Sequence, residues 1–255
     1  MVFLVFVWYC YDIVLEYRRN IMGYDLSYLV LVLPAVLFAT WASFKVKSTF
    51  NKYQGLEASN GLTGAMAAMR VMSANGIGDI PVERVRGELT DHFDPTNRVV
   101  RLSDSVYGDR SVAAIGVACH EIGHVIQYKE HYPWIKLRNA IIPATNIGSK
   151  LSIPLIIIGL ILGATSEKFI ALAYAGVALY SLSTLFQLIT LPVEFNASRR
   201  ALQQIRALGL LDSSEIKGAQ KVLTAAALTY VAALATSLAY LLRFVLLVSS
   251  SRRRD

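Results

Sequence analysis

The sequence predicts a mainly α-helical integral membrane protein, with about four transmembrane helices and a small water-facing α+β domain. Of its 255 residues, 55% are hydrophobic and only 17% are charged, whereas about a quarter of the residues are charged in an ordinary soluble enzyme. The mean hydropathy of +0.46 excludes a disordered chain. The net charge of +7 is typical of lysines and arginines at helix ends, so we expect a lipid bilayer and no nucleic acid as partner.

Three apolar runs have the length of about 20 residues that a membrane-crossing helix needs. They cover residues 26–44, 169–191 and 222–248. Arg243 lies near the end of the last run, where its long side chain can reach the lipid headgroups. A fourth run, at 153–164, is apolar but short, so it starts earlier, tilts, or only dips into the membrane.

The N-terminal lead, residues 1–25, has two interpretations. Residues 2–11 are apolar but lack the basic leading segment and small-residue cleavage site of a signal peptide. Either the lead is a membrane-lying segment, or the protein begins at Met22, directly before the first span.

The water-facing domain is expected at residues 45–150, which contain most of the charged and turn-forming residues. Thr63 can cap a helix at 64–74 that stops at Gly76, and Ser111 can cap a helix that runs to about Lys129. We assign the methionine stripe of the first helix to core packing. Between the two helices the sequence predicts extended segments at 82–92 and 98–102, joined by a turn at 94–97.

The later segments follow from the same signals. Residues 151–191 form a pair of transmembrane helices, and residues 192–221 contain a further helix, at 193–208, that ends at Gly209. The last span is followed by a basic tail at 249–255.

The helix after Ser111 contains the motif His120-Glu121-Ile122-Gly123-His124. Residues four apart lie on one face of a helix, so both imidazoles can reach one metal ion, and neutral imidazole suits Zn²⁺. Glu121 lies about 100° around the helix from His120. There it can contact a metal-bound water as a general base without itself binding the metal.

A catalytic zinc ion needs a third protein ligand and an open position for water. His131 lies about 10 Å further along the helix axis than His124, too far to share the ion. His92 is possible but lies before the second strand, and Cys119 points to another helix face and suits the core. The remaining candidate is Glu194, at the end of a span, although a carboxylate there can also be a buried cap or face the headgroups.

Three segments resemble one bacterial family. The sequences ACHEIGH (118–124), LTDHFDP (89–95) and EFNAS (194–198) resemble the YugP-like neutral zinc metallopeptidases, which are integral membrane proteins with a zincin-like catalytic domain. The likeness covers the chain from Met22 to the last span. The chain is more distantly similar to membrane zinc peptidases of the HtpX and CAAX-prenyl-protease type.

The resemblance implies one Zn²⁺ ion bound by His120, His124 and Glu194, with Glu121 as the catalytic base. The distant relatives usually have an aspartate four residues after the glutamate ligand, where this chain has Ser198. Serine can still hydrogen-bond a ligand histidine, although it orients the ring less strongly than a carboxylate does. Asn196 stands where close relatives often have an acid. Both differences affect the tuning of the site rather than its ligands.

A shared ion constrains the membrane topology. If Glu194 and His120 bind one ion, the chain between them must cross the membrane twice, which predicts a hairpin that turns at 166–168 and both termini on the face opposite the site. Most lysines and arginines near span ends lie on the site side, so the catalytic domain is expected to face the cytoplasm of a bacterial cell. The basic tail opposes this orientation.

These features together predict a membrane-embedded zinc endopeptidase that uses a zinc-activated water and Glu121 as general base, with a peptide or membrane-associated protein as substrate. His92 or Arg199 could stabilise the transition state, and strand 98–102 could pair with the substrate as a sheet edge or be an ordinary core strand. The alternatives are a zinc-binding membrane scaffold or adaptor without proteolytic activity, and a channel or transporter. The spans contain few ionisable residues for an ion path.

Overall fold

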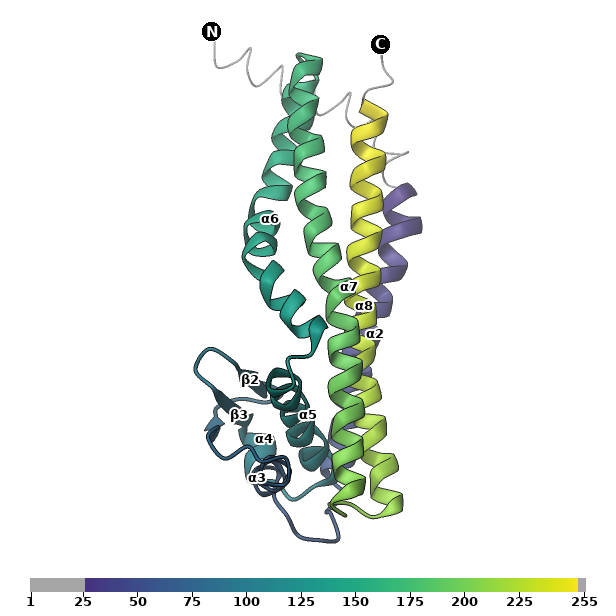
Figure 1. Ribbon diagram of the computed structural model, residues 1–255. Helices are drawn as coiled ribbons and strands as arrows, with labels where there is room; N and C mark the ends of the chain where they lie inside the picture. Colours follow the sequence, from purple (N-terminus) through teal and green to yellow (C-terminus); the bar gives the residue numbers. More distant parts are fainter. Residues whose placement is uncertain (1–25, 252–255) are drawn as a thin grey trace. The chain divides into compact units, whose positions relative to one another are not determined.

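The computed structural model describes residues 26–251. The N-terminal lead with Met22 and the arginines of the basic tail lie outside the described residues. Four helical segments of the described chain are long and apolar enough to cross a membrane, which confirms the predicted fold class. They are a π-helical turn (Tyr28–Val32) that continues into α2 (Leu33–Gln54), α6 (Pro133–Gly163), α7 (Ile170–Ala207) after a 3-10 turn (Glu167–Phe169), and α8 (Ser213–Ser251) (Figure 1).

The chain forms two compact units. Within the described residues, the first contains 26–38, Thr145–Thr184 and 235–251, and the second contains Ala39–Ala144 and Leu185–Leu234. All four long helices contribute to both units.

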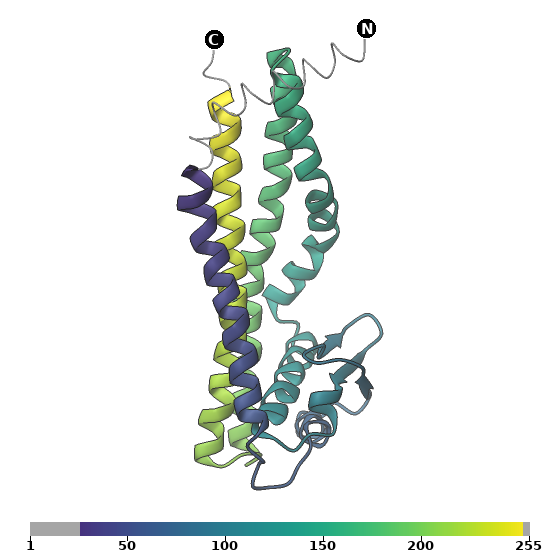
Figure 2. The ribbon, with the colours of Figure 1, turned by 180° about the vertical axis from the view of Figure 1, so that it is seen from behind.

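In the first unit, α6 and α7 form a tightly packed antiparallel hairpin (Figure 2). A Cβ atom built on Gly159 would lie 2.2 Å from the backbone nitrogen of Ala173, and one built on Gly176 would lie 2.6 Å from the carbonyl oxygen of Ser152. Only glycine lets the two helix backbones approach so closely at these positions. Small residues at such contacts are typical of helices that pack together in a membrane. The turn between them contains residues 164–169, so the predicted hairpin turn is observed.

Two helix predictions need correction. The short run at 153–164 is the end of a longer helix, α6, that begins at Pro133. The separate helix expected at 193–208 does not exist, because α7 continues from Ile170 through Pro192 to Ala207. A proline removes one backbone hydrogen bond, but Ile189 and Val193 on either side of it are buried, and their packing keeps the helix continuous.

The second unit combines helices with a small mixed sheet. Its elements are α3 (Gly64–Ala74), β1 (Val82–Val85), β2 (His92–Asp94), β3 (Val99–Ser103), α4 (Asp104–Tyr107) and α5 (Val112–Lys129). The strand order is β1-β3-β2. β1 runs parallel to β3, with Val82 opposite Val100, and β2 runs antiparallel to it, with Phe93 opposite Val100.

The predicted helix caps are present. The hydroxyl of Thr63 accepts a hydrogen bond from the Met66 N–H at 3.2 Å, and that of Ser111 accepts one from the Ala114 N–H at 3.1 Å. The methionine stripe of α3 is not core, however. Met66 and Met69 are about half exposed and only Met72 is buried, because α3 turns its alanines towards α5.

The extended segment expected at 82–92 is two strands rather than one. Gly87 and Leu89 adopt positive φ angles of 117° and 54°, and the chain leaves the sheet between Val85 and His92. The expectation that 98–102 is a sheet edge is wrong, because β3 is the central strand. The core-strand alternative is confirmed, and β2 is an edge strand.

Helix α5 lies at the centre of this unit. Its Ile115 and Ile122 are completely buried, as are Leu102 of β3, Val71 of α3 and Ile205 of α7, and all five belong to one hydrophobic cluster. Burial of each such side chain stabilises the fold by about 1.5–3 kcal/mol. The motif-bearing helix is therefore fixed against both the sheet and α7.

Candidate metal centre

Three side chains in the second unit converge as a potential metal site. The ligand atoms of His120, His124 and Glu194 all lie within 4.8 Å of one another. Two of the residues lie one turn apart on α5, and the third lies on α7. The imidazoles and the carboxylate are thus brought together from positions 70 residues apart by the packing of the two helices.

The spacing of the ligand atoms suits zinc. Glu194 Oε2 lies 3.3 Å from His120 Nε2 and 3.5 Å from His124 Nε2. Ligands held at about 2.1 Å from one ion at tetrahedral angles lie about 3.4 Å apart. Glu194 Oε2 is buried and has no hydrogen-bond partner among the described residues, although burying a polar atom without a partner is costly. A cation between the three atoms would satisfy it, so the residues fit a zinc ion.

A hydrogen-bond network fixes His124 in the form that can bind a metal. The Gln127 side-chain amide donates to the Val193 carbonyl oxygen at 2.8 Å and to Asn196 Oδ1 at 2.9 Å. Its oxygen therefore faces His124 Nδ1 at 3.0 Å and can only accept. The proton of the neutral imidazole is then held on Nδ1, which leaves the lone pair of Nε2 directed at Glu194.

Ser198 contacts the other histidine. Its hydroxyl lies 3.1 Å from His120 Nδ1, on the nitrogen opposite the one that faces Glu194. Asn196 on the same helix accepts hydrogen bonds from both Gln127 and Arg200. An uncharged serine and an uncharged asparagine on α7 thus support the cluster.

Arg138 orients the carboxylate. Its Nη1 donates to Glu194 Oε1 at 3.2 Å, which leaves Oε2 to face the two histidines. Arg138 comes from the first turns of α6, so a third helix contributes to the centre. Arg138 was not predicted from the sequence, where it is one of several basic residues near a span end.

Glu121 is almost fully buried beside the cluster. Its pKa is raised to about 7, mainly by burial and also by the charges of Glu194 and Asp91, although His120 and the Phe93 backbone N–H act in the opposite direction. A carboxyl group whose pKa lies near neutrality is suited to accept and return a proton. Phe93 belongs to β2, so the edge strand lies next to this glutamate.

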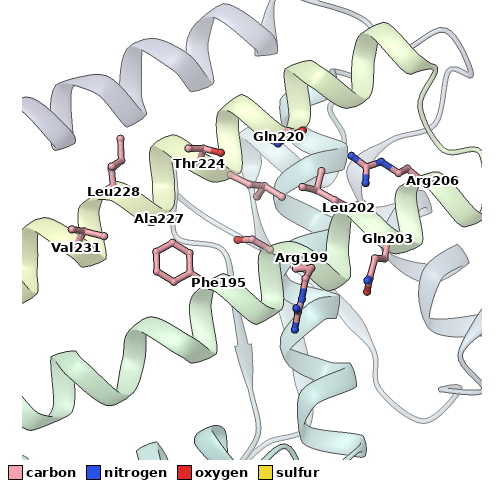
Figure 3. A pocket seen from close by; sticks show the side chains of 12 residues that line it. Phe195, Arg199, Leu202, Gln203, Arg206, Gln220, Thr224, Ala227, Leu228 and Val231 are labelled. Carbon is pink, nitrogen blue, oxygen red and sulfur yellow. The ribbon is translucent and has the colours of Figure 1, made fainter.

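The other sequence candidates lie apart from the three ligand atoms. His92 is exposed, and its Nδ1 contacts the Thr90 carbonyl oxygen at 2.8 Å. Arg199 is exposed and lines a groove of about 490 Å³ between α7 and α8 (Figure 3). His131 is exposed and has a positive φ. Cys119 is fully buried, which raises its pKa to about 12 and matches a core residue.

Comparison with known proteins connects this geometry to a family. A family model described as "Putative neutral zinc metallopeptidase" matches residues 28–249. The chain belongs to this family. It is also 50% identical over 225 residues to "Putative membrane protease YugP" of Bacillus subtilis (strain 168), an alignment that covers 88% of this chain and 98% of the relative. None of the solved structures matches the chain.

Besides Arg138, two further residues around the candidate metal centre were not predicted from the sequence. Gln127 could have been found, because it lies three residues after His124 and therefore on the same helix face. Tyr230 of α8 could not, because its place beside Glu194, Glu121 and Arg138 depends on the packing of helices that are distant in sequence.

Gly123 sets the distance between α5 and α7. A Cβ atom at this position would lie 2.5 Å from the Ala197 carbonyl oxygen and 3.1 Å from its Cα. Both atoms belong to the α7 backbone, three residues beyond Glu194, so the side chain of any other residue would push the two helices apart.

We expect Gly123→Ala to weaken zinc binding by about tenfold or more, because metal ligands tolerate shifts of only about 0.2 Å. The measurement is a zinc titration of the purified protein against a chelator. Gly78→Ala is the matched control, because a Cβ atom there meets nothing within 4 Å. Equal zinc affinity of both variants would show that the approach of α7 does not set the ligand geometry.

Proposed function

We propose that the protein is a membrane-embedded zinc endopeptidase that hydrolyses peptide bonds. The observation that supports this most directly is the convergence of two imidazole Nε2 atoms on a buried carboxylate oxygen that has no other partner, beside Glu121 with a pKa raised to about 7. His120, His124 and Glu194 would hold one Zn²⁺ ion. When bound, zinc lowers the pKa of water towards 7 and polarises a carbonyl group.

Glu121 carries out the proton transfers in this proposal. Its carboxylate accepts a proton from the attacking water and then delivers it to the nitrogen of the leaving amine. Arg138, through Glu194 Oε1, and Ser198 and Gln127, through the Nδ1 atoms of the histidines, keep the ligands oriented.

Tyr230 is our proposed donor to the developing oxyanion. Its phenol lies beside both Glu194 and Glu121, whereas His92 and Arg199 contact neither of them in the described structure. A hydroxyl donor at this place would stabilise negative charge that forms on the substrate carbonyl oxygen.

The edge strand offers a place for the substrate. β2 is paired only with β3, and its Phe93 lies next to Glu121. An extended peptide that adds to β2 would therefore run past the catalytic glutamate. Since α6, α7 and α8 all contribute to the centre, we propose membrane-associated proteins or their fragments as substrates.

We expect Glu121→Gln to retain zinc and to lose hydrolysis by a factor of about 10²–10⁴, because the amide cannot accept the proton. Glu194→Ala should lose both zinc and activity. Metal analysis of the purified proteins, together with cleavage of an unfolded protein and of a membrane-inserted peptide, checks both expectations.

The outcomes separate the two functions considered. Full activity of Glu121→Gln would exclude this residue as the base. Zinc retained by the wild-type protein, with no turnover of any substrate, would favour a zinc-binding scaffold or adaptor. Zinc retained by Glu194→Ala would show that this carboxylate is not the third ligand.

Tyr230→Phe removes only a hydroxyl group. We expect kcat to fall by about 10²–10³ with zinc content and KM nearly unchanged, because the hydrogen bond forms in the transition state. Ser198→Ala is the comparison, since loss of its hydrogen bond to His120 should reduce zinc affinity instead. An unchanged kcat in Tyr230→Phe would assign the oxyanion to another donor.

We propose that the catalytic unit faces the cytoplasm of the bacterial cell, because most of the basic residues near span ends lie on its side. A reporter fused after Asp255 should then be active only in its extracytoplasmic form. A C-terminal reporter that is active in the cytoplasm would reverse the orientation.

A further inference from the structure

A groove between α2 and α8 collects four lysines. Lys45 and Lys52 of α2 and Lys217 and Lys221 of α8 line a cavity of about 630 Å³. All four are exposed, and every residue that lines the cavity belongs to the second unit. We call this feature the four-lysine groove.

The lysines meet because of their helical spacing. Lys45, Thr49 and Lys52 follow one another at intervals of four and three residues, and so do Lys217, Lys221 and Thr224. Such intervals place the side chains on one face of each helix, and the two faces point into the same groove. The neighbouring Lys47 of α2 is on a different face and is not part of the lining.

Close packing shapes the groove. A Cβ atom on Gly218 would lie 2.8 Å from the ring of Tyr53 and 3.0 Å from Val112. The glycine thus lets the Tyr53 ring lie directly against α8, and this ring forms part of the lining. The Nζ atom of Lys52 lies 5.8 Å from the ring centroid. The Tyr53 ring and the lysines thus line one open groove between the two helices.

The charge of the groove is uncompensated. The lining contains no aspartate or glutamate, and within residues 26–251 no ion pair involves any of the four lysines. Four like charges in one cavity repel one another. Each ammonium group has three N–H donors, and Thr49 and Tyr53 add hydroxyl groups, so the groove is complementary to an oxyanion such as a phosphate.

The position along the helices indicates where the phosphate comes from. Lys45 directly follows the apolar run 26–44, and Lys221 directly precedes the run 222–248. The groove therefore lies where a spanning helix meets the headgroups. Its lining continues into the apolar Ala225 and Leu228, and the neighbouring Phe44 is 71% exposed.

We propose that the four-lysine groove binds the headgroup of an anionic phospholipid, with the phosphate between the lysines and the acyl chains along the apolar surface that begins at Phe44, Ala225 and Leu228. Basic residues at a membrane surface attract anionic lipids additively. A cavity that collects four of them from two helices would retain such a lipid specifically. The site involves none of the zinc ligands, so it is independent of the proposed peptidase activity.

The test uses the full chain in a neutral detergent. Phosphatidylglycerol and, separately, phosphatidylcholine are titrated into the protein, and bound lipid is counted by native mass spectrometry. We expect phosphatidylglycerol to bind at least tenfold more tightly than phosphatidylcholine. This preference should disappear in the quadruple variant Lys45→Gln, Lys52→Gln, Lys217→Gln, Lys221→Gln.

The matched control removes four exposed basic residues outside the groove: Lys47→Gln, Arg70→Gln, Arg86→Gln, Lys136→Gln. It carries the same net charge as the groove variant and should keep the preference. If the quadruple variant does not fold, as judged by circular dichroism, the pairs Lys45→Gln with Lys217→Gln and Lys52→Gln with Lys221→Gln are each expected to reduce the preference at least threefold.

Three results would overturn the proposal. The first is equal binding of the two lipids by the wild-type protein. The second is an equal loss of preference in the control and groove variants, which would show a general effect of charge. The third is lysine-dependent binding of inorganic phosphate or of an acidic peptide without retention of phosphatidylglycerol, which would show that the occupant is not a lipid.

Discussion

The architecture of the second unit depends on one buried carboxylate. Glu194 Oε2 faces two imidazole nitrogens and has no hydrogen-bond partner among the described residues, and a positive charge among the three groups would stabilise this arrangement. The other features serve this requirement. Gly123 permits α7 to approach α5, and Arg138 fixes the second carboxylate oxygen.

The features that were predicted correctly depend on residues that are close together in the sequence. The HExxH helix, its Ser111 cap and the Thr63 cap all depend on residues within one or two turns. The hairpin could be predicted for another reason, since one ion cannot be bound from both sides of a membrane. Glu194 was the remaining candidate after the other histidines and Cys119 were weighed, and the resemblance to related proteins supported it, because a carboxylate at the end of a span has several ordinary roles.

The errors have a common physical origin in tertiary packing. Pro192 predicts a helix boundary in sequence, but burial of its neighbours keeps α7 continuous. Strand β3 is central because β1 and β2 both pair with it. The five residues of β3 alone do not indicate how many neighbouring strands it has. Arg138 and Tyr230 reach the centre from helices that are remote in the chain. Basic residues and tyrosines are common at membrane boundaries, so neither had a distinguishing pattern.

The continuity of α7 has a mechanical consequence. The helix runs without a break from Ile170, at the hairpin turn, to Ala207. Glu194 and the apolar segment before it therefore belong to one continuous helix. A spanning helix tilts or shifts to match the thickness of the surrounding hydrocarbon, and its side chains move with it. The rise of an α-helix is about 1.5 Å per residue. In a metal site the distances between ligand atoms and the ion stay within about 0.2 Å of their usual values. A tilt of α7 would therefore change the position of the Glu194 carboxylate together with that of the apolar segment, and Pro192 is the one proline inside this helix.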